Sequence, residues 1–400
     1  MSATHPEVKA VQYSIGRRQL IVGAGATLAG SLLEGCGIAP RNESPGPGLA
    51  FAPIRASTDR IIGINVCTRP FRAQGPRLDV EKIGEKTVVH NYGHGGSGWS
   101  LSLGSSGIAV EKAMATGERE IAVIGCGALG LTSALLLQRT GARVTIYAKE
   151  LPPNVRSSLA TGLWSPDSRI CFEEYATPVF KQLWERMARD SFRTYQTQLG
   201  LPGEPVEYFD SYFVSGASPI KRFAGREVPR PRLANLQRKL IPDLTPRGRE
   251  VTPGSHTFGT RFLRQNTTMM FNIAAYTRML MSDFLSAGGK IEIREFGAPS
   301  EFARLPQKTL INATGYGARA LLGDTSVTPW RGQLARVIPQ PEVKYGLFYN
   351  GVSFVPRRDG LVFQVVGADE YYGYDDDSVA PDRAEAELAV NTIGELFKGT

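Results

Sequence analysis

The sequence feature that most constrains the fold is a short apolar strand that leads into a glycine-rich turn and a helix. Ile121–Ile124 are apolar residues typical of a buried parallel strand. Gly125, Gly127 and Gly130 then form a G-x-G-x-x-G pattern. The first glycine allows a tight turn, the second lets a pyrophosphate approach the backbone, and the third lets the helix pack closely on the strand. The start of such a helix offers free N–H groups and a partial positive charge to phosphates.

Because one glycine pattern is weak evidence, the sequence around it decides the interpretation. A helix rich in Leu and Ala is predicted over 128–140, and a second strand over 144–147. Glu150 follows about 20 residues after the glycines, where an acid would hold a ribose hydroxyl. This order predicts a dinucleotide-binding fold. The alternative is a glycine-rich turn in an ordinary α/β domain.

Length, charge and composition narrow the choice of function. A chain of 400 residues can form one large or two medium domains with a sizeable core. The net charge of +8 fits anionic ligands or an anionic surface, but the basic residues form no dense run, which argues against nucleic acid as a partner. The four Cys lack the spacing of metal ligands, and with only four His no metal site is predicted.

Residues 1–36 resemble an export signal. Arg17-Arg18 is a twin arginine, and the run Gln19–Leu33 that follows is uncharged, moderately apolar and too short for a secure membrane span. The sequence Leu-Glu-Gly-Cys that ends at Cys36 resembles a bacterial lipoprotein cleavage box. We therefore expect twin-arginine export to the bacterial cell envelope or periplasm, with Cys36 as a candidate lipid tether. The alternative is a tail with a chance arginine pair, and residues 37–58 are expected to be a linker.

A second glycine-dense segment follows a strand predicted over 87–90. Residues 91–100 read Asn-Tyr-Gly-His-Gly-Gly-Ser-Gly-Trp-Ser, and a helix is predicted from about Gly104 to Ala115. Such a loop lets backbone approach a ligand and directs a helix dipole at negative charge. The alternative is a flexible loop. Upstream, a strand is predicted over 60–66, followed by Thr-Arg-Pro-Phe-Arg at 68–72.

Together these segments resemble the D-amino-acid oxidase family of flavoenzymes. Val-His-Asn-Tyr-Gly-His-Gly-Gly at 89–96 is close to that family's signature, and residues 68–72 look like its substrate-arginine segment. The glycine turn looks like its FAD site, and further similar segments lie at 148–152, 160–166, 310–315 and 330–333. The resemblance covers residues 59–400. It implies an α/β fold in which an FAD-binding Rossmann-like domain is interleaved with a mixed α+β substrate domain.

The order of these segments differs from that of the family. Its usual members carry the Arg-Pro and His-Asn-Tyr-Gly-His-Gly-Gly segments at the end of the chain, whereas here both precede the glycine turn. The sequence therefore predicts a circular permutation, which a fold tolerates where the joined termini lie close together. We expect an FAD-binding domain at 59–170, made of the permuted segment 59–116 and the turn region 121–150 and completed by 300–335. The substrate domain is expected at 171–299 and 336–400, with helices over 177–199, 271–287 and 382–397.

The resemblance also implies a substrate site. Arg69 would bind the substrate carboxylate through both guanidinium nitrogens, and the backbone carbonyl of Gly96 would accept the substrate amine. Tyr349 would donate to the carboxylate or cover it, while Ser353 stands where the family carries a second active-site tyrosine and so alters the pocket wall. From the residues alone, Arg69 would be a surface ion pair and Tyr349 a packed aromatic.

FAD is the cofactor that the resemblance implies. Gly125, Gly127 and Gly130 would take the pyrophosphate and Glu150 the ribose, with Lys149 as a further contact. Ser100 would bond the flavin pyrimidine oxygens near a helix start, whose dipole favours the negative charge of reduced flavin. The other cofactor contacts expected are Ala128, Leu129, Thr161, Gly162, Leu163, Gly95, Ser97, Gly98 and Trp99.

The implied reaction is oxidative deamination of D-amino acids or similar small amines. A hydride passes from the α-carbon to flavin N5, the imine hydrolyses to a 2-oxo acid and ammonia, and oxygen takes up the electrons as hydrogen peroxide. The partners are thus an amino acid or amine substrate and molecular oxygen or another electron acceptor. Two alternatives remain open: a dehydrogenase of the same fold that passes electrons to a membrane carrier, and a flavin-binding protein without turnover.

Overall fold

The computed structural model describes residues 49–215, 230–367 and 369–398. The expected export signal, with Cys36, lies outside the described residues, and so does most of the expected linker. Within the part of the chain that is described, no helix is long and apolar enough to cross a membrane.

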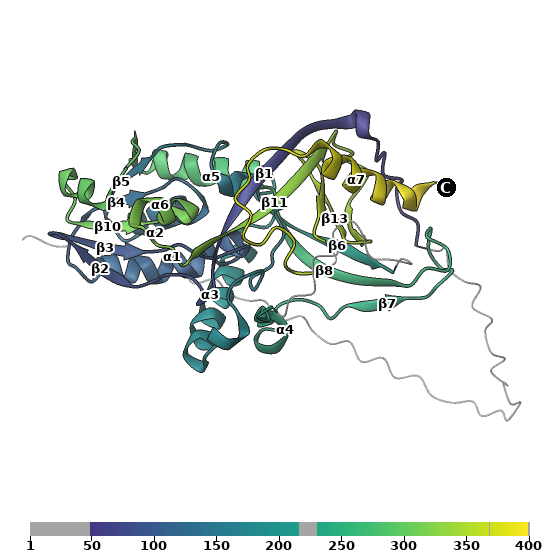
Figure 1. Cartoon of the computed structure of the whole chain (residues 1–400), viewed down its shortest axis with the longest axis horizontal. Coiled ribbons are helices and arrows are strands. Elements are labelled where there is room, and N and C mark those ends of the chain that lie inside the picture. The colour runs from purple at the N-terminus through teal and green to yellow at the C-terminus, as the bar shows by residue number, and fades with distance from the viewer. Residues whose placement is uncertain (1–48, 216–229, 368, 399–400) are drawn as a thin grey trace, which may run out of the picture. The chain divides into compact units, whose positions relative to one another are not determined.

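The dinucleotide turn belongs to a six-stranded sheet (Figure 1). All neighbouring strands in it are parallel except β2, which runs antiparallel to β3. The strands in order across the sheet are β2 (Val80–Ile83), β3 (Lys86–His90), β10 (Thr309–Asn312), β4 (Glu120–Ile124), β5 (Arg143–Ala148) and β9 (Lys290–Ile293). The strands β3 and β10 are buried throughout, as expected for parallel strands covered on both faces.

Four helices pack around this sheet and one another. Contacts join α1 to α2 and α3, and join α2 to α5. The largest apolar core lies between these helices and the sheet, and it includes Val89, Val123, Leu131 and Trp184. The helices are α1 (Gly98–Met114), α2 (Ala128–Arg139), α3 (Pro178–Gln196) and α5 (Ile273–Ser286).

The second sheet has eight strands and is mostly antiparallel. In order they are β1 (Ile61–Arg72), β11 (Val327–Val337), β14 (Gly360–Val365), β13 (Val352–Arg357), β12 (Tyr345–Tyr349), β6 (Val206–Val214), β8 (Leu263–Phe271) and β7 (Arg249–Val251). Helix α7 (Arg383–Gly394) packs on one face and shares an apolar core with it. The short elements are α4 (Gln237–Leu240), α6 (Ala318–Leu322) and 3-10 turns at Thr58–Arg60, Arg156–Leu159, Glu173–Tyr175, Pro299–Arg304, Gly315–Gly317 and Glu395–Phe397.

Two elements are longer than the sequence predicts. The helix expected from about Gly104 begins at Gly98, inside the glycine-rich segment. Glycine lowers helix propensity, but Gly104 lies where α1 crosses α3, and a Cβ there would come within 2.5 Å of Met187 Cα. The additional first turns, residues 98–103, are also held by α3, because the Tyr195 hydroxyl bonds the Ser102 hydroxyl and donates to the Trp99 carbonyl. The strand expected over 60–66 continues through Arg72, because it pairs with β11 along its whole length.

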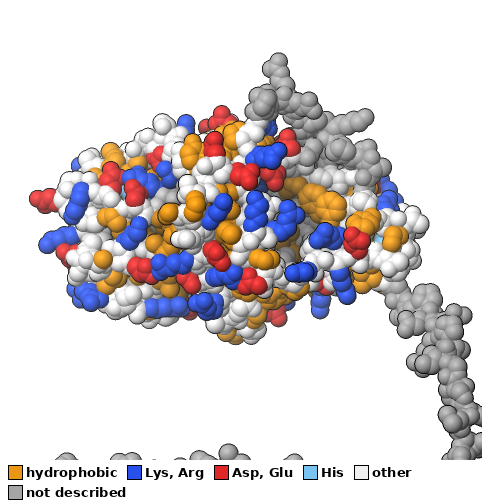
Figure 2. All heavy atoms as spheres, turned by 90° about the horizontal axis from the view of Figure 1, so that it is seen from below, with side chains coloured by type: hydrophobic (Ala, Val, Ile, Leu, Met, Phe, Trp, Pro, Cys, Tyr) orange, Lys and Arg blue, Asp and Glu red, His pale blue; other side chains and the backbone are white. Residues whose placement is uncertain are grey.

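The expected domain limits also differ in detail from the two sheets. Strands β1 and β11, expected in the FAD-binding domain, pair with each other in the eight-stranded sheet. Strand β9, expected in the substrate domain, pairs with β5 in the six-stranded sheet. On the face in Figure 2, Lys and Arg side chains are spread over the whole surface, with Asp and Glu side chains among them.

Candidate active site

A cavity of about 680 Å³ lies where the carboxyl ends of β3, β4, β5 and β10 meet the eight-stranded sheet. Open α/β sheets bind ligands in the crevice outside the carboxyl ends of their strands. The volume is within the range of ~300–1,000 Å³ for ligand pockets. Its wall combines the dinucleotide turn, the glycine-rich segment after β3 and the middle of β1.

The dinucleotide turn has the geometry that its glycines predict. Gly125 has a φ of 106°, which only glycine adopts without strain, and its N–H donates to the Tyr147 carbonyl across 2.8 Å. The first N–H of α2, on Ala128, donates to the hydroxyl of Ser157 at 3.0 Å and lies at the cavity wall. The turn thus presents a helix start to the cavity, as phosphate binding requires.

The glycine-rich segment is held between β1 and the loop that precedes residue 170. The N–H of Gly95 donates to the Pro70 carbonyl at 2.8 Å, and the N–H of Gly96 donates to the Ser168 carbonyl at 2.9 Å. These bonds hold the backbone of Gly95 and Gly96 between Pro70 on β1 and Ser168. Arg69, the residue before Pro70 on β1, and Gly96 both line this cavity.

His94 has a structural place in the same segment. Ser105 donates its hydroxyl hydrogen to Asn91 Oδ1 at 2.6 Å, so its oxygen accepts from His94 Nε2 at 2.7 Å. Burial lowers the pKa of His94 to about 3, so the ring is neutral at physiological pH. His94 therefore anchors the loop to α1 as a neutral donor.

The segment at 160–166 lies along β8 and lines the cavity. The Gly162 carbonyl accepts from the Phe271 N–H at 2.7 Å, and Gly162 has a φ of 91° that suits glycine alone. Arg357 donates to the Ala160 carbonyl at 2.6 Å, which fixes the segment from the other side. Thr161 donates to Gln364 Oε1 at 2.7 Å, and both residues line the cavity.

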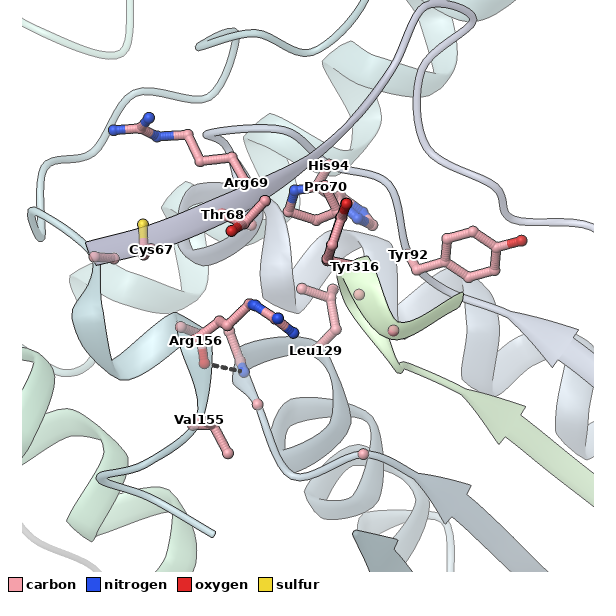
Figure 3. Close-up of a pocket in the computed structure, with 18 of the residues that line it drawn as sticks. Cys67, Thr68, Arg69, Pro70, Tyr92, His94, Leu129, Val155, Arg156 and Tyr316 are labelled. Atoms are coloured by element: carbon pink, nitrogen blue, oxygen red, sulfur yellow. Dashed lines mark hydrogen bonds between the residues drawn. The ribbon is translucent and has the colours of Figure 1, made fainter. Parts of the chain in front are cut away.

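Arg69 lies near the end of β1, and its guanidinium packs against the backbone of β11. One guanidinium nitrogen donates to the Arg331 carbonyl at 2.9 Å, and the guanidinium lies against Gly332, where a Cβ would come within 2.6 Å of Arg69 Cζ. No carboxylate among the described residues lies within 4.0 Å of it. In Figure 3 the Arg69 side chain extends from β1 away from Leu129, at the start of α2, and away from Arg156. The Arg69 guanidinium and the glycine turn at 125–130 thus lie at different parts of one cavity.

Strand alternation corrects the expectation for Tyr349. Directly opposed residues on neighbouring strands share a face. Tyr349 pairs with Val352 and Val214, and all three belong to the core cluster on the α7 side of the sheet. Tyr349 is buried there and is absent from the cavity wall. Ser353, the next residue on β13 after Val352, points to the opposite face and lines the cavity.

Most of the other predicted site residues line the cavity. They are Arg69, Gly95, Gly96, Gly98, Trp99, Gly125, Gly127, Ala128, Leu129, Lys149, Glu150, Thr161, Gly162, Leu163 and Ser353. Ser97, Ser100 and Gly130 do not. Ser97 donates to the Ser168 carbonyl at 3.0 Å, and Ser100 accepts from the Ser165 N–H at 2.8 Å, so both hydroxyls hold the cavity wall in place. Gly130 packs against the carbonyl of Gly125, which is the role the third glycine was expected to have.

The sequence analysis missed several wall residues. Arg156 stacks over the Tyr316 ring at 5.2 Å, and Ser157 accepts from the first N–H of α2. Gln364 pairs with Ser353 across β13 and β14, so strand alternation starting from Ser353 could have found it. Arg169 also lines the cavity, and no pattern in the sequence marks it.

Comparison with known proteins decides the family. The sequence profile of the FAD dependent oxidoreductase (DAO) family matches residues 120–399. The chain belongs to this family of FAD-dependent oxidoreductases. The profile begins at β4, so the residues that carry Arg69 and the glycine-rich segment precede the matched part. The circular permutation stays a prediction.

Similar proteins include two curated D-amino-acid oxidases. The protein from Rubrobacter xylanophilus is 30% identical over 283 residues, which are 68% of this chain and 76% of that protein. The protein from Streptomyces coelicolor is 27% identical over 226 residues, which are 56% of this chain and 60% of that protein. Among solved structures, iminodiacetate oxidase from Chelativorans sp. BNC1 has a TM-score of 0.47 and 15% identity, covering 70% of this chain and 80% of that one.

The cavity of this oxidoreductase fits FAD. The turn at 125–128 presents a helix start for the pyrophosphate, and Lys149 and Glu150 line the wall at the end of β5, where the ribose is held in dinucleotide folds. Residues 161–163 and four residues of the glycine-rich segment also line the cavity, namely Gly95, Gly96, Gly98 and Trp99. Among the described residues no group of three or more His, Cys, Asp or Glu side chains could hold a metal ion.

Proposed function

We propose that this FAD-dependent oxidoreductase converts D-amino acids to 2-oxo acids, ammonia and hydrogen peroxide. The observation that carries the proposal is Arg69, a guanidinium on the cavity wall with no carboxylate partner among the described residues. A cation that the protein does not pair is available to a substrate carboxylate. The D configuration is supported by the two curated relatives, which are both D-amino-acid oxidases.

Each part of the wall has a role in positioning such a substrate. Arg69 binds the α-carboxylate, and the carbonyl of Gly96 accepts from the amine. Because Gly95 and Gly96 are hydrogen-bonded to both neighbouring segments, this carbonyl is held in a fixed place relative to Arg69. Two fixed contacts orient the α-carbon, which is the main contribution that a protein makes when a cofactor carries the chemistry.

The bound flavin supplies the hydride acceptor. The protein needs no acid or base of its own if the amine binds unprotonated. The buried His94 is too weakly basic to act as one, and its Nε2–H already donates to Ser105. Gln364 and Thr161 bond each other, so they present a neutral polar surface to the substrate.

The test is an anaerobic titration of the purified full-length protein with D- and L-amino acids. We expect D-amino acids alone to bleach the oxidised-flavin absorption band, and Arg69→Met to weaken this response while the flavin remains bound. Bound flavin that no D-amino acid bleaches would refute the proposal. Stoichiometric peroxide on readmission of oxygen separates an oxidase from a dehydrogenase that needs another electron acceptor.

We also propose twin-arginine export for this chain, on the basis of Arg17-Arg18 and the apolar run after them. This route carries folded proteins, which suits an enzyme that acquires FAD before export. Replacing both arginines with lysine should keep the protein in the cytoplasmic fraction of a bacterial host. Unchanged fractionation of that variant would exclude the route.

A further inference from the structure

A second arginine shares the cavity with Arg69. Arg169 lines the cavity wall in the loop that binds the glycine-rich segment, and its φ of 52° is in the left-handed region, which is unusual for a non-glycine residue. Residues in such conformations gather at functional sites, where the surrounding structure holds them. Here the carbonyl of Arg169 lies against Gly95, where a Cβ would come within 2.8 Å of its carbon atom.

The side chain of Arg169 is partly buried, and its guanidinium has no carboxylate partner among the described residues. Its contacts are the Glu370 carbonyl at 3.2 Å, the Ser168 hydroxyl at 3.4 Å and the ring of Trp330, whose centroid is 4.9 Å from Cζ. The Nε atom is buried without any hydrogen-bond partner among the described residues. No described carboxylate lies within 4.0 Å, although the Glu370 carboxylate is near enough to contribute attraction.

The two arginines are close enough to repel each other. Burial, and after it the charge of Arg69, lower the pKa of Arg169 to about 9, with Glu370 opposing the shift. Both arginines are partly withdrawn from water, and a charge in such a place is normally paired, because an unpaired one is costly. Two unpaired guanidiniums on one cavity wall therefore indicate a ligand that brings two negative charges.

The cofactor phosphates do not meet this need. They belong at the turn formed by Gly125 and Gly127, whereas Arg169 lies beside Arg69 and stacks on Trp330, which pairs with Arg69 across β1 and β11. The wall residues Ser168, Ser353 and Gln364 are polar but neutral, and the Ser168 hydroxyl is the one that contacts Arg169. The second negative charge must then come from the substrate.

We propose that the preferred substrates are acidic amino acids, with the α-carboxylate on Arg69 and the side-chain carboxylate on Arg169. This inference rests on the proposed function, because it names the substrate class of the same site. It also distinguishes this chain from an oxidase of neutral amino acids, for which a second partly buried cation would have no partner.

The experiment compares acidic substrates with their uncharged amides in the full-length holoprotein. We expect kcat/KM to be at least tenfold higher for D-aspartate or D-glutamate than for D-asparagine, D-glutamine or D-alanine. Arg169→Met should lower kcat/KM for the acidic substrates by roughly 10- to 100-fold, as expected for loss of one charged hydrogen bond, and leave the amides nearly unchanged. Arg169→Lys should restore part of the preference.

Binding supplies a readout that does not depend on turnover. Succinate should perturb the flavin spectrum at a lower concentration than butyrate in the unchanged protein, and Arg169→Met should abolish that difference. Arg143→Met is the matched control, because Arg143 is an exposed arginine paired with Glu120. It removes the same charge from the chain and should preserve the preference for succinate.

Three results would overturn the inference. If D-alanine or the amides are oxidised as well as the acidic substrates by the unchanged protein, the second carboxylate is not recognised, although the proposed function stands. If Arg169→Met weakens all substrates equally, Arg169 serves the cofactor or the fold. If bound flavin reacts with no D-amino acid, the proposed function fails, and the inference fails with it.

Discussion

Gly332→Ala should disable the proposed carboxylate site although Arg69 itself is not replaced. A Cβ at residue 332 would lie 2.5 Å from Arg69 Nη1 and 2.6 Å from Cζ, which is far inside normal contact distance. The atoms in the way are the end of a long side chain, so the guanidinium moves and the backbone of β11 stays in place. The added methyl group therefore displaces Arg69 from its bond to the Arg331 carbonyl.

The expected size follows from the interaction that is lost. A hydrogen bond to a charged group contributes about 1.5–3 kcal/mol, and each 1.4 kcal/mol corresponds to a tenfold change in affinity. We therefore expect the Kd of a small monocarboxylate such as benzoate to rise roughly 10- to 100-fold, measured by flavin difference spectra. The free energy of unfolding should change by less than about 1 kcal/mol, because no backbone or core atom is displaced.

A double-mutant cycle tests whether the effect passes through Arg69. In an Arg69→Met background Gly332→Ala should weaken benzoate binding no further, so the coupling energy should equal the effect of the single glycine substitution. Gly63→Ala is the matched control: Gly63 is also a strand glycine that faces an arginine, but its Cβ would lie 3.6 Å from the nearest Arg336 atom. Unchanged benzoate affinity in Gly332→Ala, or additive effects in the double variant, would refute the reasoning.

Other predictions concern stability and the cofactor. Gly104→Ala should lower the free energy of unfolding by about 1–3 kcal/mol, because a Cβ there would overpack the helix crossing. Gly107→Ala should raise it by about 0.4–1 kcal/mol, because no atom lies within 4 Å of the added Cβ. Urea titrations measure both changes. The Gly130→Ala variant should lose FAD on gel filtration, because the added Cβ would lie 2.8 Å from the carbonyl carbon of Gly125. If this variant retains FAD normally, the packing argument is wrong. Burial lowers the folded pKa of His94 to about 3, so its contribution to stability is present above an unfolded pKa of about 6.5 and falls by about 1.4 kcal/mol per pH unit below it. His94→Gln should flatten the fall in the urea midpoint between about pH 6 and pH 4.5, and an unchanged slope would contradict that origin.

The sequence predicted those parts of the fold in which local pattern and tertiary structure agree. The expected strand–turn–helix unit at 121–140 matches β4 and α2 within a residue at each end, because apolar run, glycine spacing and helix propensity all favour it. Local sequence patterns could not predict that β1 pairs with β11, because the pattern of one strand does not specify its distant partner. The early start of α1 was missed for a related reason, because the bonds that hold its first turns come from Tyr195 on another helix.

The candidate site shows the same limit at the level of side chains. Family resemblance placed Tyr349 in the pocket, but its face of β12 is set by pairing with Val352, and that face is the core. Conversely, Arg169 follows no motif, and its importance comes only from the neighbours that the fold gives it. Motifs therefore predicted the cavity wall around the glycine turn better than the wall around Arg69 and Arg169.

The cavity separates these two tasks in physical terms. At the turn, negative charge is recognised by backbone N–H groups and a helix dipole, which any sequence with the glycine spacing can supply. On β1 and the loop before residue 170, we propose that it is recognised by the side chains of Arg69 and Arg169, whose positions depend on contacts with Gly332, Gly95 and Trp330. Substrate preference should therefore change through substitutions at these contacts while FAD binding persists. Gly332→Ala and Arg169→Met probe the two arginines separately, so a variant that loses FAD together with the substrate would contradict this separation.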